Sequence, residues 1–180
     1  MIPAAPPPPA GCRHNGRPAG KERSRAITAI AVGGVAAGIL DICSAIGAWL
    51  PRGVPPVRIL QSVASGVYGG DAYQGGWSTA IVGLGLHFLI ALTAAAVFYA
   101  ASRVLRFMTD RPVLAGFIYG ELVYLFMNFV VIPLSAIGER APLSLQSLIT
   151  GPIGHLLFVG LPISLAVRHY AGRRPLPVLR

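Results

Sequence analysis

The sequence predicts an all-α fold, that of a polytopic membrane protein with four transmembrane helices and a short outer interfacial helix. Hydrophobic residues make up 54% of the 180 residues and charged residues only 12%, whereas about a quarter of a typical soluble domain is charged. Residues 78–102 contain no Lys, Arg, Asp or Glu, and about 20 apolar residues are enough to cross the hydrocarbon core of a bilayer as a helix. The charged residues gather at the ends of such runs, as membrane topology requires.

The length of the chain allows one compact domain with a tail at each end. We predict a disordered, basic and proline-rich cytoplasmic tail over residues 1–25, because four consecutive prolines and few large apolar residues cannot form a core. A four-helix transmembrane domain over 26–170 and a basic tail over 171–180 follow. A cleaved signal peptide is disfavoured, because the next apolar segment exceeds the usual h-region of about 7–15 residues. Cys12 and Cys43 are expected to be reduced thiols.

The first predicted span, residues 26–50, has one face of small and polar residues. On a helix with 3.6 residues per turn, that face holds Gly34, Ala37, Gly38, Asp41, Ser44, Ala45 and Ala48. The opposite face holds Val32, Ile39, Ile46 and Leu50. Because small residues let helices approach closely in lipid, we expect the first face to pack on a neighbouring helix, with Gly34 and Gly38 as a GxxxG pair. The branched face should contact lipid.

A short helix is expected between the first two spans, over residues 56–66. Pro55 and Pro56 supply a start signal and Gly69 and Gly70 a stop signal. The segment should lie at the outer interface; a solvated loop is the alternative. Its Arg58 is placed either to contact lipid phosphates or to remain in solvent.

The second predicted span, residues 77–105, also has a face of small residues, on which one histidine lies. This face holds Ala80, Gly83, His87, Ala91 and Ala94, whereas Val82, Leu89 and Leu92 point away. His87 should therefore face protein.

The third and fourth predicted spans, residues 113–137 and 145–169, are interrupted by prolines. The third has a second GxxxG pair, and its Glu121, Tyr124 and Asn128 share one face. Pro133 should kink or end it, and Pro162 should kink the fourth span. An outer turn over 138–142 joins the two.

The distribution of Lys and Arg predicts the orientation. Twelve of the fifteen lie in the two tails, the second connection and, for Arg168, the end of the fourth span next to the C-terminal tail; three lie in the first and third connections. The positive-inside rule then places both termini in the cytoplasm. The net charge of +9 does not indicate nucleic-acid binding, since no basic face with interleaved aromatics is present. The expected partner is the lipid bilayer, and the small-residue faces also permit a homo-oligomer.

Five polar residues within the predicted spans form a candidate buried polar cluster: Asp41, His87, Glu121, Asn128 and His155. At a rise of about 1.5 Å per residue, four of them lie roughly 13–15 Å below the outer end of their spans and Glu121 roughly 24 Å. An Asp at a helix centre costs about 2.5–3.5 kcal/mol on insertion. Asp41 must therefore be protonated, partnered or hydrated, and we predict a contact with His87 or His155.

Three functions are compatible with such a cluster. Titratable groups at the midplane suit the movement of protons or small solutes. Alternatively, the polar residues only fix helix packing in a structural or accessory subunit. The third is a haem or metal binder, in which the two histidines would ligate a haem or, together with Asp41 and Glu121, a metal. No serine–lysine, HExxH or paired-aspartate pattern is present, so we predict no enzyme activity and assign no catalytic, cofactor-binding or metal-binding residue.

Three short motifs resemble those of the YagU-like proteins, a group of uncharacterised bacterial inner-membrane proteins. They are GLHFLIAL in the second span, VVIPLSAI in the third and GHLLFVGLP in the fourth. The resemblance covers roughly residues 36–169. It implies an inner-membrane location and four spans, and it carries no catalytic residue or substrate to transfer.

Overall fold

The computed structural model describes residues 19–137 and 145–171, which form helices joined by turns. Four helical segments are long and apolar enough to cross a membrane: Gly20–Arg52, Gly76–Val104, Pro112–Leu134 and Leu148–Ala171. The predicted all-α class and the predicted number of such helices are therefore confirmed. The outer turn over 138–142 and most of both predicted tails lie outside the described residues.

The first helix, α1 (Ala19–Trp49), begins earlier than the predicted span. Residues 19–25, AGKERSR, continue it into the segment that we expected to be disordered, so that part of the prediction is wrong. Ala, Lys, Glu and Arg are strong helix formers, and here they extend a long apolar helix. The helix ends in the 3₁₀ turn η1 (Leu50–Arg52), where Pro51 cannot continue the ladder and Gly53 takes a left-handed φ of 80°.

A helix also forms between the first two spans, where α2 (Pro56–Tyr68) precedes the 3₁₀ segment η2 (Gly69–Tyr73). It packs on α3 (Gly76–Val104) at Gly83, where any side chain would overlap the carbonyl of Leu60. On its other side, the backbone N–H of Ala136 donates to Gly66 O at 3.0 Å. Helix α2 therefore bridges α3 and the end of the third apolar segment.

The third and fourth apolar segments each contain a π-helical turn. After the short α4 (Phe107–Asp110), the third consists of α5 (Pro112–Phe126), the π segment η3 (Met127–Val131) and α6 (Ile132–Leu134). The fourth consists of α7 (Leu145–Gly154), the π segment η4 (His155–Gly160) and α8 (Leu161–Ala171). Pro133 and Pro162 lie just after these π turns. Because proline has no backbone N–H, each interrupts the regular series of α-helical hydrogen bonds at that point.

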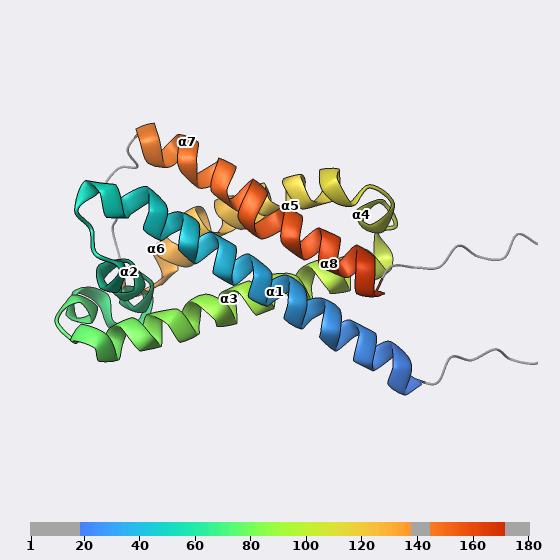
Figure 1. Ribbon diagram of the computed structural model, residues 1–180, viewed down its shortest axis with the longest axis horizontal. Coiled ribbons are helices and arrows are strands. Elements are labelled where there is room, and N and C mark those ends of the chain that lie inside the picture. Colours follow the sequence, from blue (N-terminus) through green and yellow to red (C-terminus); the bar gives the residue numbers. More distant parts are fainter. Residues whose placement is uncertain (1–18, 138–144, 172–180) are drawn as a thin grey trace, which may run out of the picture.

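The four apolar segments form a bundle in which α1 packs on both α3 and α8, while α5 packs on η4 and α8. The start of α1, the end of α8 and α4 lie at one end of the bundle (Figure 1). Helices α2 and α6 and the start of α7 lie at the other end (Figure 1). We call these the α4 end and the α2 end. The described chain therefore begins and finishes at the same end.

The apolar core lies in the half of the bundle toward the α4 end. Phe98, Ile163 and Val167 are fully buried there. The Tyr119 ring packs edge-on against Phe98, with centroids 5.0 Å apart, and its hydroxyl donates to Ala94 O at 2.7 Å. These contacts join α3, α5 and α8 and close this half of the bundle.

Helix α1 turns its small face inward as expected. Gly34, Ala37 and Gly38 are buried, while Val32 and Ile39 are exposed. One prediction for α3 is wrong, because Leu92 does not point away from the protein. A Cβ on Gly34 would lie 2.9 Å from Leu92 Cα, so the missing side chain lets this leucine pack directly on α1.

The second GxxxG pair, Gly116 and Gly120, packs within the chain as well. A Cβ on Gly116 would lie 2.9 Å from Gly160 O, and one on Gly120 would lie 2.9 Å from Leu156 Cα. Both small-residue faces that we considered for a homo-oligomer are thus occupied by helices of the same chain.

Candidate functional site

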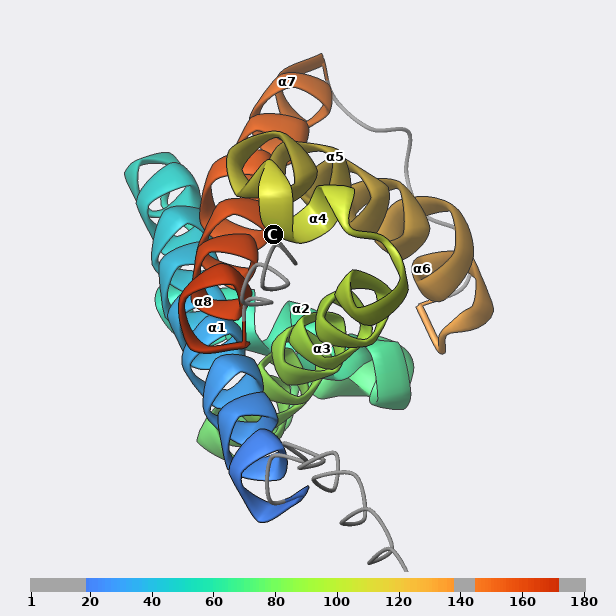
Figure 2. The same ribbon diagram turned by 90° about the vertical axis from the view of Figure 1, so that its right-hand side faces the viewer.

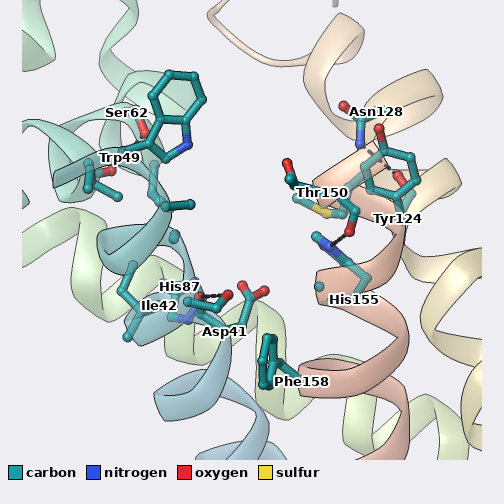
Figure 3. Close-up of a pocket in the computed structure, with 18 of the residues that line it drawn as sticks. Asp41, Ile42, Trp49, Ser62, His87, Tyr124, Asn128, Thr150, His155 and Phe158 are labelled. Carbon is teal, nitrogen blue, oxygen red and sulfur yellow. Dashed lines mark hydrogen bonds between the residues drawn. The ribbon is translucent and has the colours of Figure 1, made fainter. Parts of the chain in front are cut away.

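A cavity of about 920 Å³ opens in the half of the bundle toward the α2 end. Its walls come from α1, α2, α3, the α5–η3 segment and the α7–η4 segment. Four residues of the predicted polar cluster line it: Asp41, His87, Asn128 and His155. Figure 3 shows these side chains around a common space between α1 and η4. Four elements that are distant in sequence therefore contribute polar groups to one site.

Asp41 lies on α1 and is half-buried. Its carboxylate points into the cavity (Figure 3). The predicted contact with a histidine is not formed, because no hydrogen bond or ion pair joins Asp41 to His87 or His155. Each histidine bonds a backbone carbonyl instead: His87 Nε2 lies 2.9 Å from Gly38 O, and His155 Nδ1 lies 3.1 Å from Gly151 O.

These two bonds fix which nitrogen of each neutral ring carries the proton. A carbonyl oxygen only accepts, so His87 must donate through Nε2 and His155 through Nδ1. In the neutral tautomer, His87 Nδ1 and His155 Nε2 are then hydrogen-bond acceptors. Within the part of the chain that the structure describes, neither of these two nitrogens has a hydrogen-bond partner. Two lone pairs and one carboxylate are thus available around the cavity.

Asn128 lies in the π segment η3, where Nδ2 donates to Tyr124 O at 2.9 Å. The Tyr124 ring is buried and packs edge-on against His155, with centroids 5.3 Å apart. Gly151 allows this approach, because a side chain there would overlap the Tyr124 ring. The α5 wall is therefore held against α7 and η4 by tight ring packing.

Glu121 is the one residue of the predicted cluster that the cavity does not include. It is half-buried, and its carboxylate forms no hydrogen bond or ion pair among the described residues. The neighbouring Gly120 packs against the backbone of η4, and the next residue on a helix points about 100° away from it. Of the three residues that we predicted on one helix face, Tyr124 and Asn128 therefore line the cavity and Glu121 does not.

The rim of the cavity contains residues that the sequence did not identify as part of a site. Arg58 of α2 is exposed, and its guanidinium carbon lies 4.6 Å from the centroid of the Tyr73 ring, in cation–π geometry. Trp49 of α1 and Ile153 of α7 also line the cavity and are 44% and 53% exposed. Only tertiary packing brings these three elements together, and no local pattern indicates it.

Hydrogen-bond acceptors from Asp41, His87 and His155 line the cavity, and the Arg58 guanidinium lies at its rim. Phe98 and Ile163 of the apolar core are not among the residues that line the cavity. Among residues 19–137 and 145–171, no group of three or more His, Cys, Asp and Glu side chains lies close enough together to hold a metal ion.

Comparison with known proteins adds no relative, since no protein-family model, curated protein or solved structure matches the chain. The resemblance to the YagU-like proteins stays a prediction.

Proposed function

We propose that the protein is a multi-pass protein of the bacterial inner membrane that moves protons or small solutes through the polar cavity. The observation that carries this proposal is that Asp41, His87, Asn128 and His155, from four apolar segments, line one cavity. Ionisable residues within membrane spans are costly, and they commonly mark ion and substrate pathways.

The proposed orientation has both termini in the cytoplasm and the α2 end outside. Seven basic residues lie toward the α4 end: Lys21, Arg23, Arg25, Arg103, Arg106, Arg111 and Arg168. Two described basic residues, Arg52 and Arg58, lie toward the α2 end. This asymmetry agrees with the positive-inside rule. In this orientation α2 is the outer interfacial helix, with exposed Val67 and Tyr68 at the membrane surface.

The cavity would then be open to the outside and closed to the cytoplasm. Asp41 and the free nitrogens of His87 and His155 can each take a proton that arrives through water. Onward movement requires an opening of the apolar core. The π turn η4 and Pro162 lie at the junction between α7 and α8, which is where such a helix can change direction.

Proton flux into vesicles tests the proposal. Purified protein is reconstituted into liposomes that carry a pH-sensitive dye, and a pH gradient is imposed. Wild type should pass protons faster than empty liposomes, and Asp41→Asn, His87→Gln and His155→Gln should each reduce the rate about tenfold or more. Glu121→Gln is the matched control, because it also removes a titratable group from an apolar helix but lies outside the cavity.

A structural or accessory role is the second candidate, favoured by a different observation. His87 bonds the Gly38 carbonyl of another helix, and bonds between helices are worth about 0.6 kcal/mol on average in membrane proteins. Asn128 and His155 bond carbonyls of their own helical segments. Flux equal to that of empty liposomes, under imposed gradients of protons and of small cations, would favour this role and reject the first.

A further inference from the structure

The cavity has a side opening between α1 and the last apolar segment. Helix α1 packs along α8 and η4, whereas α1 and α7 separate (Figure 2). Residues on both sides line the cavity, among them Asp41 and Trp49 of α1 and Thr150 and Ile153 of α7. The site is therefore bounded by two helices that separate.

The edges of this opening are apolar and exposed. Trp49 and Ile153 stand on the α1 and α7 sides, and each both lines the cavity and presents about half of its surface outward. On helices that cross a membrane, such side chains face lipid. A site filled only from water would not need an apolar edge, whereas a ligand with an apolar tail would leave that tail between these residues.

The polar part of the cavity lining calls for a hydrogen-bond donor. The Asp41 carboxylate points into it, and His87 Nδ1 and His155 Nε2 accept hydrogen bonds in the tautomers that their backbone bonds require. A protonated primary amine carries three N–H donors and one positive charge, so it can pair with the Asp41 carboxylate and still donate to an acceptor nitrogen of one of the two histidines.

We propose that the cavity takes an amphiphile with a primary ammonium group, which enters sideways from the outer leaflet between α1 and α7. This inference rests on the proposed function and specifies its solute. The ammonium binds near Asp41, His87 and His155, and the tail leaves past Trp49 and Ile153. The cavity volume of about 920 Å³ is in the range of small-molecule sites, roughly 300–1,000 Å³.

Two sources can supply this chemistry, and Arg58 separates them. An aminophospholipid carries a phosphate beside its ammonium, and the Arg58 guanidinium at the rim is placed to bind a phosphate. A simple lipophilic amine has no such group and would not depend on Arg58.

Photolabelling of the full-length protein in nanodiscs of phosphatidylcholine and phosphatidylglycerol tests the proposal. Three probes carry the same diazirine near the head of an alkyl chain: a phosphatidylethanolamine, a phosphatidylcholine and an alkylamine. Mass spectrometry then locates the label. We expect at least one primary-amine probe to label 41–49 and 150–154 several-fold more than the choline probe, which has no N–H donor.

Variants connect the label to the cavity. Asp41→Asn and His155→Gln should each lower amine labelling about tenfold, while Glu121→Gln leaves it unchanged. Ile153→Trp should obstruct the opening and lower labelling, whereas Ile149→Trp is the control, since Ile149 is equally exposed on α7 but outside the lining. Because Asp41→Asn, His155→Gln and Ile153→Trp are independent changes, the other two still test the proposal if one of the three variants does not fold.

The outcomes are distinct. If Arg58→Gln lowers labelling by the ethanolamine probe alone, the ligand is an aminophospholipid; if only the alkylamine labels, it is a lipophilic amine. Equal labelling by the choline probe, or labelling indifferent to Asp41 and His155, overturns the proposal. Flux that depends on Asp41 without amine labelling rejects this ligand class alone, and amine labelling without flux rejects the proposed movement alone.

Discussion

His87 of α3 donates a hydrogen bond through Nε2 to the carbonyl oxygen of Gly38 on α1, at 2.9 Å. The two residues are 49 positions apart. Gly38 is buried, and a side chain there would come within 2.8 Å of the Phe88 ring. The glycine thus brings α3 close enough for the histidine to reach the backbone of α1.

Replacing His87 with Phe should destabilise this contact modestly. The change removes the donor to Gly38 O and keeps an aromatic ring of similar size, so we expect a loss of about 0.6 kcal/mol, up to about 1.7. Thermal unfolding in mild detergent, compared with wild type, measures it. His87→Gln keeps a donor and should lose less; a larger loss in His87→Gln than in His87→Phe would contradict the assigned bond.

Gly83→Ala should separate α2 from α3. The added methyl would overlap the backbone carbonyl of Leu60, and backbone cannot move aside without shifting the helix, so we expect a cost of about 1–3 kcal/mol. Gly85→Ala is the control on the same helix, because nothing lies within 4 Å of a Cβ at that position. Equal melting temperatures for the two variants would show that α2 does not pack here.

Gly160→Ala should disturb the packing of the π segment on α5. A Cβ at Gly160 would lie 2.8 Å from Gly120 Cα and would overlap the carbonyl of Gly116, so we again expect a cost of about 1–3 kcal/mol. Gly154→Ala, with nothing within 4 Å of the new methyl, should be neutral. Urea or thermal unfolding of both variants compares the two sites, and a loss only in Gly154→Ala would contradict the described contact.

Labelling of single cysteines checks the orientation. In a background with Cys12→Ser and Cys43→Ser, we expect an impermeant thiol reagent to label Asp71→Cys in intact cells but not Asp110→Cys. Both positions are exposed and lie at opposite ends of the bundle, in η2 and α4. Detergent lysis should make both react. The reverse pattern in intact cells would place α2 in the cytoplasm.

Much of the fold follows from the periodicity of the sequence. Small residues every three or four positions correctly predict which side of α1 is buried, since Gly34, Ala37 and Gly38 face the neighbouring helices. The start of α1 was not predictable from polarity, because Lys21, Glu22 and Arg23 are hydrophilic and yet favour helix. The orientation of Leu92 was not predictable from the α3 sequence alone. Leu92 faces the protein because Gly34 on α1 leaves room for it, and the periodicity of one helix does not show which residues its neighbour presents.

The candidate site was predictable only in part. Helical phase and depth identify Asp41, His87, Asn128 and His155 as inward polar residues. Their actual bonds depend on the nearest backbone carbonyl, and for His155 that is Gly151 in its own helix. The same reasoning included Glu121, which lies two turns before Asn128, and the α-helix of Glu121 changes to the π segment that contains Asn128. Arg58 and Trp49 line the site because of where α2 lies and how far α1 extends, and neither was predictable from the sequence pattern.

The unequal filling of the two halves of the bundle has a consequence for how the molecule unfolds. Fully buried Phe98, Ile163 and Val167 hold the four segments together near α4, while a large hollow separates them near α2. Free energies of local opening follow the density of such buried contacts. Amide hydrogens around the hollow should therefore exchange with deuterium well before those around Phe98, and the molecule should lose its structure from one end.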